Sequence, residues 1–379
     1  MNENFCIREI IPDSAKTVIE SIGFDKSYVH ASVKKYNFKL IKICNLSCPQ
    51  ANIIKQVALS AGADAAVHRE VITCKVEKTD LLLGGTIAQL ENICQKLKNQ
   101  PFKLSELSDH LLKQLTVKKH TWSDKTYIMG ILNVTPDSFS DGGKYFDPEK
   151  AAEHAKEIIK AGADIIDIGG ESTRPHSKEV NIDEELKRVL PVIEKIRSFN
   201  TTIPLSIDTR HAEVAKQAVQ AGANIINDVS GLEWDGNMVN IAAELQVPVV
   251  IMHSVGSSET RYDYKENIVD AVYKDLCRKT QKALSLGLKP ENIIIDPGIG
   301  FGKTVEHNLE LVKRIGEFKS LGYPVLIGIS RKSFISGDED VTLALNTYAA
   351  TNGADIIRVH NVDKHVKAMK VLQTLNNIS

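Results

Sequence analysis

Eight short apolar segments recur through the last two-thirds of the chain, and nearly every one ends on a polar or charged residue. They are residues 127–133, 164–171, 203–208, 224–229, 247–253, 292–298, 323–332 and 355–360. Helical patterns separate them, and strands that alternate with helices predict βα units and a parallel sheet. Eight such units predict an α/β fold closed into a (β/α)8 TIM barrel, and residues 121–379 have about the ~250-residue length typical of that barrel.

The residues before the barrel predict a small mixed α/β N-terminal domain. Helical patterns cover 13–23, 51–62 and 86–98, and strand-like patterns cover 36–44 and 79–85. Alternating residues near Phe38 predict a strand with one solvated face. We therefore expect two domains, residues 1–115 and residues 121–379, with the change of domain carried by segment 96–125, which has no strand pattern of its own.

The ends of the eight predicted strands make a first candidate site, because chemistry in such barrels sits at the C-terminal ends of the strands. The residues in question are Asn133, Glu171, Asp208, Asn227 with Asp228, His253, Asp296, Lys332 and His360. An Asp or Asn at a strand end can equally serve only to cap the next helix. Three of them at one cavity, Asp208, Asn227 and Asp296, fit a ligand with a heterocyclic amide edge, since carboxylates accept N–H donors and an Asn amide both donates and accepts.

Two loops and the last strand carry further candidates. The long turn-rich segment 133–143 contains Asp141 and favours a mobile lid over a solvated turn. Arg174 follows the second strand, and its planar fork suits a carboxylate or phosphate unless it is an ordinary surface residue. Arg358 and His360 are two apart on the last strand, so their side chains point the same way and favour an anion site.

Three other patterns are weaker indications of a functional site. Residues 297–304 nearly spell a phosphate-binding P-loop, but the first position is Pro297, which lacks an N–H group. His253 and His360 suggest a metallohydrolase, yet no His-x-His pair ends the first strand. Cys44 and Cys48 have a spacing seen in zinc sites, but nothing completes four ligands, and a buried structural role is favoured.

Composition narrows the class of protein. The net charge is −1 and 25% of residues are charged, which argues against nucleic acid or an anionic membrane surface as a partner. No apolar run approaches the ~20 residues needed to cross a bilayer. The polar start of the chain has no secretory pattern, so we expect a cytoplasmic protein with its six cysteines reduced.

The motifs ILNVTPDSFSDGG, GGESTRP, SIDT, NDVSG, MH, DPGIGFGK, GISRKSF and IIRVH occur in this order. Together they strongly resemble the dihydropteroate synthase family, over essentially all of 127–372. The resemblance implies an enzyme of folate biosynthesis that joins 6-hydroxymethyl-7,8-dihydropterin pyrophosphate to p-aminobenzoate and releases pyrophosphate. It also implies Mg²⁺ as a cofactor and a homodimer.

The resemblance further implies a role for each matching residue. The pterin ligands are Asp208, Asn227, Asp296 and Lys332. The pyrophosphate ligands are Asn133, Arg358 and His360, with Mg²⁺ near Asn133. The p-aminobenzoate site is lined by Thr173, Arg174, Pro175, Phe301 and Ser333. Asp141 closes over the reaction with its loop, and the catalytic group comprises Asp141, Asp208, Lys332, Arg358 and His360.

The chain departs from the family pattern in three places. Met252-His253 is not followed by the usual polar Gly-Pro loop, segment 336–355 looks shortened, and the N-terminal domain lies outside the core enzyme. The short segment bears on the homodimer more than on the chemistry. Two alternatives stay open: a related barrel that transfers methyl groups from methyltetrahydrofolate to a corrinoid, and a pterin-binding paralogue without activity.

Overall fold

The computed structural model describes residues 7–116, 120–135, 147–171, 180–255 and 262–377. The chain divides into two compact units, which meet between Lys118 and Lys119. The two units have separate clusters of buried apolar side chains. Each unit therefore has a core of its own.

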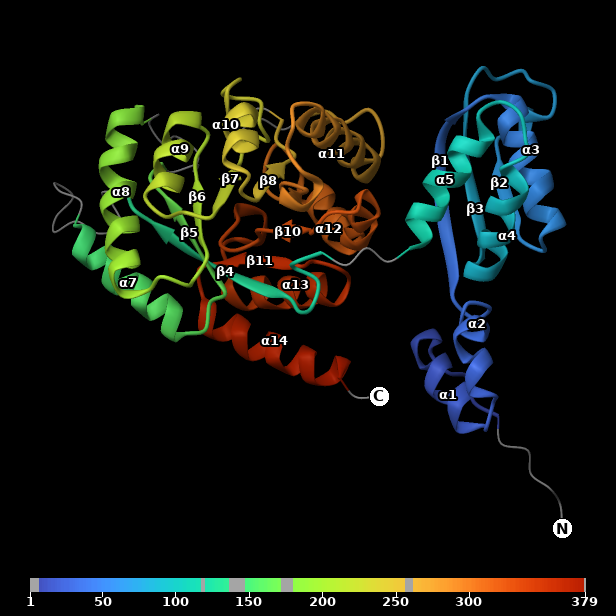
Figure 1. Cartoon of the computed structure of the whole chain (residues 1–379), viewed down its shortest axis with the longest axis horizontal. Coiled ribbons are helices and arrows are strands. Elements are labelled where there is room, and N and C mark those ends of the chain that lie inside the picture. Colours follow the sequence, from blue (N-terminus) through green and yellow to red (C-terminus); the bar gives the residue numbers. More distant parts are fainter. Residues whose placement is uncertain (1–6, 117–119, 136–146, 172–179, 256–261, 378–379) are drawn as a thin grey trace, which may run out of the picture. The chain divides into compact units, whose positions relative to one another are not determined.

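The N-terminal unit contains a three-stranded antiparallel sheet in the order β1-β3-β2 (Figure 1). Its elements are α1 (Ala15–Ser21), α2 (Val29–Val33), β1 (Phe38–Leu46), α3 (Cys48–Ser60), β2 (Asp64–Val67), β3 (Thr79–Thr86), α4 (Ile87–Leu97) and α5 (Leu104–Leu115). The start of α4 is fixed by a capping box: Thr86 Oγ1 accepts the Gln89 amide N–H, and Gln89 Oε1 accepts that of Thr86. The expected small α/β domain is thus confirmed.

The core of this unit adds two details to the sequence pattern. Helix α5 falls in the segment where no strand was expected, and its Leu104 and Leu111 are buried in the same cluster as Ile43 of β1. Cys48 is buried as expected, but Cys44 is exposed, because it lies beside Ile43 on a strand whose neighbouring side chains point to opposite faces. The buried role predicted for both cysteines is wrong for Cys44.

The second unit is the predicted barrel. Its parallel strands are β4 (Tyr127–Asn133), β5 (Ile165–Gly169), β6 (Leu205–Asp208), β7 (Ile225–Asp228), β8 (Val249–Met252), β9 (Ile293–Asp296), β10 (Leu326–Ile327) and β11 (Ile356–Val359). They pair in the order β10-β11-β4-β5-β6-β7-β8-β9, and a parallel bridge between Ile295 and Val325 joins the two ends. The sheet is therefore closed into a ring.

Helices alternate with these strands and surround them (Figure 1). They are α7 (Pro148–Lys160), α8 (Ile182–Phe199), α9 (Ala212–Gln220), α10 (Met238–Leu245), α11 (Ile268–Ser285), α12 (Val305–Lys313), α13 (Glu339–Thr351) and α14 (Val362–Asn376). Their buried faces pack on the outward side chains of the strands in one large apolar cluster. The α/β TIM barrel expected from the alternation of strands and helices is confirmed.

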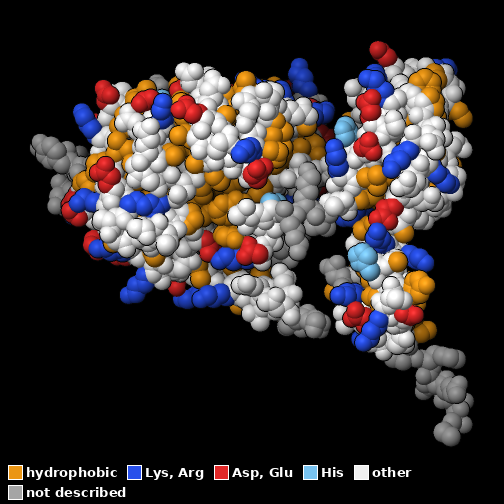
Figure 2. All heavy atoms as spheres, viewed as in Figure 1, with side chains coloured by type: hydrophobic (Ala, Val, Ile, Leu, Met, Phe, Trp, Pro, Cys, Tyr) orange, Lys and Arg blue, Asp and Glu red, His pale blue; other side chains and the backbone are white. Residues whose placement is uncertain are grey.

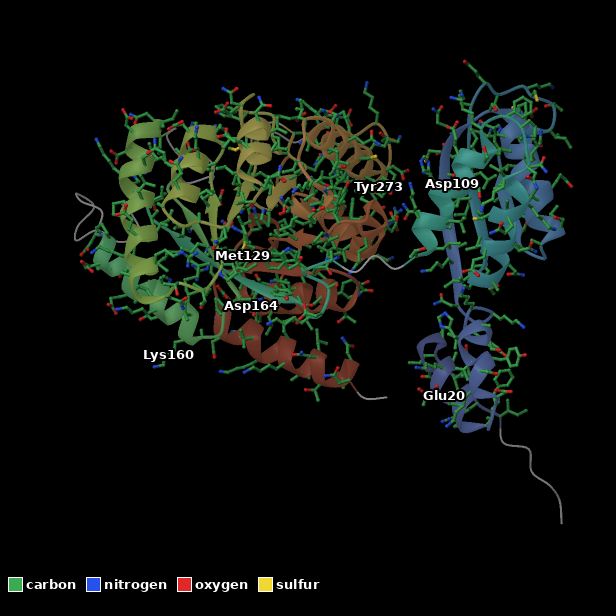
Figure 3. The ribbon with its side chains drawn as sticks, in the orientation of Figure 1. Glu20, Asp109, Met129, Lys160, Asp164 and Tyr273 are labelled. Atoms are coloured by element: carbon green, nitrogen blue, oxygen red, sulfur yellow. The ribbon has the colours of Figure 1, made fainter. Side chains whose placement is uncertain are left out.

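The interior of the barrel is apolar near the N-terminal ends of its strands. Seven strands contribute to a cluster of Met129, Ile165, Ile225, Val250, Ile294, Leu326 and Ile356, and Trp122 packs against it. Met129, labelled among the strands in Figure 3, is fully buried there. Because side chains on a strand return to the same face every second residue, positions 131, 167, 227, 252, 296, 328 and 358 form the next layer. Going toward the C-terminal ends of the strands, that layer is the first one with polar side chains.

The surface agrees with the balanced composition. On the face shown in Figure 2, Lys and Arg side chains are interspersed with Asp and Glu over both units. Within the described ranges, no helix is long and apolar enough to cross a membrane.

A glycine in β4 gives a test of barrel packing. A Cβ at Gly130 would lie 2.6 Å from Ile158 Cγ2 and 3.0 Å from Val362 Cγ2, so Gly130→Ala forces α7 and α14 away from the sheet. We expect a loss of about 1–3 kcal/mol in the free energy of unfolding of the barrel, measured by urea denaturation. Gly236→Ala is the matched control, since nothing lies within 4 Å of its added Cβ. Equal unfolding midpoints for the two variants would contradict this packing.

Candidate active site

A cavity opens at the C-terminal ends of the strands, directly above the apolar layer. It holds about 480 Å³ of space between protein atoms, counting its open mouth. The lining residues are Ile131, Asp208, Asn227, Val229, Met252, Asp296, Ile299, Phe301, Gly328, Ser330, Lys332 and Arg358. Six of the predicted site residues therefore share one cavity, although they come from strands and loops far apart in the sequence.

Arg358 connects the buried acidic groups at the base of the cavity. Its Nε donates to Asp167 Oδ2 at 2.6 Å and its Nη2 donates to Asp208 Oδ2 at 2.6 Å. Asn227 Nδ2 donates to the same oxygen of Asp167 at 3.1 Å. Asp167 is fully buried and Asp208 is nearly so. One guanidinium thus holds side chains from β5 and β6 in fixed positions, and through Asp167 it orients the amide of Asn227.

Burial and charge act against each other in this cluster. Burial raises the pKa of Asp208 to about 7, although the positive charge of Arg358 opposes the rise. For Arg358, burial works to lower the pKa, but the carboxylates of Asp167 and Asp208 outweigh it and the pKa is raised. The guanidinium therefore stays charged, while Asp208 can change its ionisation near neutral pH.

Asp296 and Lys332 are two further charged groups that line the cavity. Asp296 ends β9, accepts the Gly298 amide N–H at 2.7 Å, and has its pKa raised to about 6 by burial. Lys332 has its pKa lowered to about 8 by burial and by Arg358. The ammonium of Lys332 lies 4.1 Å from the centre of the Phe301 ring, a cation–π contact. The cavity thus combines a carboxylate, a cation and an aromatic face.

The remaining described candidates surround this centre. The Nδ1 atom of His360 is 2.9 Å from Ser330 Oγ, which lines the cavity. A Cβ on Gly169 would lie 3.6 Å from Asp208 Cβ and 3.7 Å from Asn133 Oδ1, so Asn133 and Asp208 are close neighbours. Ser333 is exposed at the start of a short 3-10 helix, Ser333–Ile335, directly after Lys332.

Four predicted residues, Asp141, Thr173, Arg174 and Pro175, lie outside the described residues.

Three residues of the first candidate site have structural roles instead. Glu171 forms a two-bond ion pair with Arg210, at 3.0 and 2.7 Å. Asp228 accepts the amide N–H groups of Ser230 and Leu232, both at 2.8 Å, and so shapes its own loop. His253 is buried, and burial, with the charge of Lys303, lowers its pKa to about 2, which leaves it neutral.

Sequence reasoning missed Asp167 and Ser330. Asp167 interrupts the apolar run of β5, and a charge within a strand that is buried on both sides is a signal for a partner inside the barrel. Its partner Arg358 is 191 residues away, so the pairing itself was not visible. Ser330 stands within a motif that was noted, but only the fold brings it beside His360.

Comparison with known proteins agrees with this geometry. Residues 129–360 match the family described as pterin binding enzyme. A dihydropteroate synthase of Clostridium beijerinckii is 46% identical over 269 residues, which cover 67% of this chain and 96% of that protein. The chain belongs to the dihydropteroate synthase family. A solved Xanthomonas albilineans dihydropteroate synthase with 4-aminobenzoic acid has a TM-score of 0.64 and 40% identity over 68% of this chain and 95% of its own.

The N-terminal unit is partly shared with larger members of the dihydropteroate synthase family. A probable bifunctional folylpolyglutamate synthase/dihydropteroate synthase of Haloferax volcanii is 40% identical over 355 residues, or 85% of this chain. The matched part of this chain is longer than the barrel unit, so the likeness includes part of the N-terminal unit. The chain spans only 41% of the length of that relative.

The Arg358 cluster predicts a strong energetic coupling. Arg358→Met leaves two buried carboxylates without their cation and should lower the free energy of unfolding by about 3–5 kcal/mol. Asp167→Asn removes one of those carboxylates, so the double variant should lose less than the sum of the single losses, by about 1–3 kcal/mol. Urea unfolding of the four proteins measures this coupling.

The exposed pair Arg331–Glu339, 3.0 Å apart, is the matched control, and its coupling should stay below about 1 kcal/mol. Strictly additive losses for Arg358 and Asp167 would show that the two groups do not stabilise each other.

Proposed function

We propose that the barrel condenses 6-hydroxymethyl-7,8-dihydropterin pyrophosphate with p-aminobenzoate, giving 7,8-dihydropteroate and pyrophosphate, as a transferase of folate biosynthesis. The observation that carries the proposal is the meeting of Asp208, Asn227, Asp296 and Lys332 at one cavity. The membership of the chain in the dihydropteroate synthase family supports it.

The donor and acceptor pattern of the cavity suits a pterin. A pterin ring presents amine and ring N–H donors beside carbonyl and ring-nitrogen acceptors along one edge. The carboxylates of Asp208 and Asp296 accept such donors, the Asn227 amide supplies both kinds of group, and Lys332 donates to an acceptor. The apolar side chains of Ile131, Val229, Met252 and Ile299 line the same cavity and contact the faces of a flat ring.

The pyrophosphate end belongs near Arg358, His360 and Asn133. Arg358 commits Nε and one Nη2 N–H to carboxylates, and the remaining N–H groups of the guanidinium are available to bind a phosphate oxygen. His360, on the same side of the strand two residues further on, is closer to the cavity mouth. A cation at this position neutralises the charge that develops on the leaving group, which is usually a large part of catalysis.

Mg²⁺ fits this end of the site only as a partner of the substrate. Within the described ranges, no three His, Cys, Asp or Glu side chains come together as a metal cluster. Mg²⁺ often takes few protein ligands and fills its shell with water and phosphate oxygens. The Asn133 amide oxygen would hold one position of an ion brought by the pyrophosphate, and the ion would neutralise phosphate charge.

The second substrate belongs on the side of Phe301, Lys332 and Ser333. The Phe301 ring offers a face to a benzene ring, and Arg174, with Thr173 and Pro175, is proposed to hold the carboxylate. In the reaction, the bond between the pterin methylene carbon and the pyrophosphate oxygen breaks, and the electron pair leaves with pyrophosphate. The amine nitrogen then bonds to the methylene carbon and loses a proton, while nearby carboxylates stabilise the cationic carbon. Asp141 is proposed to close over this step.

Assembly and location stay predictions. Val341 and Tyr348 of α13 expose apolar surface of the kind that a homodimer would bury, and a solution mass measurement tests it. The cytoplasmic location rests on the sequence pattern alone.

The direct test is an activity assay. Purified protein with the pterin pyrophosphate, p-aminobenzoate and Mg²⁺ should release pyrophosphate and form dihydropteroate in equal amounts, detected by a coupled phosphate assay and chromatography. Lys332→Met should lower kcat/KM by about 100-fold or more, because a buried charged donor to the ligand is lost. Pterin binding without turnover by the wild-type protein would support the inactive paralogue, and methyl transfer from methyltetrahydrofolate would support the corrinoid enzyme.

The raised pKa values predict how pterin binding depends on pH. Asp296 and Asp208 are ionised above about pH 6 and 7, respectively, and only the ionised forms accept ligand N–H donors fully. Affinity for 6-hydroxymethylpterin, measured by calorimetry, should be highest between about pH 7 and 8, where both carboxylates are largely ionised and Lys332 is still protonated. It should fall by about tenfold per pH unit between pH 7 and 6, where one carboxylate takes up a proton, and by about 100-fold per unit below pH 6, where both do. Asp296→Asn should flatten the dependence near pH 6. Constant affinity of the wild-type protein from pH 5 to 8 would contradict the assignment of these carboxylates.

A further inference from the structure

The loop between β9 and α12, residues 297–304, is held by the lysine that ends the DPGIGFGK motif, to which the sequence analysis assigned no role. Lys303 is 8% exposed, and its ammonium donates to the carbonyl oxygens of Gly298 at 2.7 Å and Phe301 at 3.0 Å. It also lies 3.0 Å from Nδ1 of His253 at the end of β8. A protonated lysine has three N–H donors, and here each of them has an acceptor.

The direction of the contact with His253 follows from chemistry. Burial lowers the pKa of Lys303 to about 7, so the direction depends on the protonation of this lysine. In its ammonium form Lys303 cannot accept a hydrogen bond, so Nδ1 of His253 accepts and the ring proton is on Nε2. His253 is 2% exposed, and its lowered pKa keeps the ring neutral and able to accept. The neutral histidine therefore acts as a fixed anchor on β8 for the ammonium of Lys303.

The backbone of this loop needs such an anchor. Gly298 has φ +68°, and a Cβ there would lie 1.9 Å from the carbonyl oxygen of His253, so the loop is pressed against β8. Gly300 has φ +82°, and its amide N–H donates to Asn308 Oδ1 at 2.7 Å. The tightly folded loop turns the carbonyls of Gly298 and Phe301 toward each other, and the ammonium satisfies both.

Two residues of this loop line the cavity, Ile299 and Phe301, and Phe301 is the one that contacts Lys332. Its ring lies under the ammonium of Lys332, 4.1 Å from the ring centre, and both residues line the cavity. The backbone carbonyl of Phe301 is one of the three acceptors of Lys303. The position of the ring thus depends on a lysine that does not itself line the cavity.

We propose that Lys303, anchored on His253, is a positioning residue that holds the Phe301 ring against Lys332 and so shapes the p-aminobenzoate half of the site. The proposal rests on the proposed function, because it assigns that substrate to the side of Phe301. Lys303 contacts no substrate; it acts through the loop. Of the groups proposed to hold the pterin, Asp208 and Asn227 come from β6 and β7 and do not contact this loop. Asp296 meets the loop through the Gly298 N–H, and Lys332 meets it through the Phe301 ring, so the effect on the pterin is expected to be smaller than that on p-aminobenzoate.

The test compares Lys303→Met with Lys282→Met. Methionine keeps most of the side-chain length but has no N–H donor, while Lys282 is an exposed lysine of α11 and serves as the matched control. Lys303→Met should raise the KM for p-aminobenzoate by about tenfold or more, since two buried carbonyls lose their donor, and change the KM for the pterin pyrophosphate by less than about threefold. Lys303→Arg, which keeps charge and donors, should restore part of the difference.

A second readout does not need activity. Hydrogen exchange of the peptide 293–304 should quicken in Lys303→Met, because the amides of Gly298, Gly300 and Phe301 are all hydrogen-bonded within this region, and should be unchanged in Lys282→Met. If the wild-type protein is inactive but the exchange differs in this way, the proposed function fails and the anchoring of the loop stands.

Two results would overturn the proposal. Equal rises in both KM values would show a general structural role, and unchanged exchange with unchanged KM values would show that the loop holds Phe301 without the lysine. If Lys303→Met does not fold, the comparison of Lys303→Arg with the wild type provides both readouts.

Discussion

The ion pair between Arg358 and the carboxylates of Asp167 and Asp208 is the interaction on which the site depends. A charge inside a barrel is costly unless it is paired, and a single guanidinium here pairs two buried carboxylates from adjacent strands. Because Asn227 is bound to the same Asp167 oxygen, the orientation of its amide is set by the same cation. The side chains of Asp208 and Asn227, which are proposed to bind the pterin, are thus held in place before any ligand arrives, and this lowers the entropy that binding would otherwise cost.

The C-terminal end of β8 is the second fixed point, and it is made by two buried lysines. Lys279 of α11 donates to the carbonyl oxygen of Met252 at 3.0 Å, while Lys303 donates to the neighbouring loop and to His253. A Cβ on Gly231 would lie 2.1 Å from the same Met252 oxygen, so the loop after β7 also closes onto β8. The loops after β7 and β9 therefore both close onto the end of β8, and the two lysines satisfy backbone groups that would otherwise be buried without a donor.

Much of this was accessible from the sequence, and the limits have a physical basis. The eight strands could be predicted because buried parallel strands are continuous apolar runs, and their ends located Asp208, Asn227 and Asp296. Lys332 was expected at the end of a strand over 323–332, but β10 ends at Ile327 and Lys332 follows five residues later. Helix α5 was missed because the segment around it was interpreted only as a change of domain, although Leu104 and Leu111 complete a core. Glu171 and Asp228 satisfied the same strand-end rule as the true cavity residues, and only the fold shows that Arg210 and a local turn use them. The pairing of Asp167 with Arg358 could not be predicted, because only the closed barrel brings β5 and β11 to the same cavity.

Three charged groups of the cavity, Asp208, Asp296 and Lys332, are displaced toward their neutral forms, while Arg358 is held in its charged form by its two carboxylates. Burial raises the pKa of Asp208 and Asp296 and lowers that of Lys332, so each group is less stable in its charged form than it would be in water. A ligand with N–H donors on one edge and phosphate charge at one end stabilises the ionised carboxylates and the protonated lysine alike. Ligand and protein charges then stabilise each other, and part of the binding energy keeps these groups in their charged forms. A neutral ring without phosphate would therefore gain only the share of the binding energy that the two carboxylates provide.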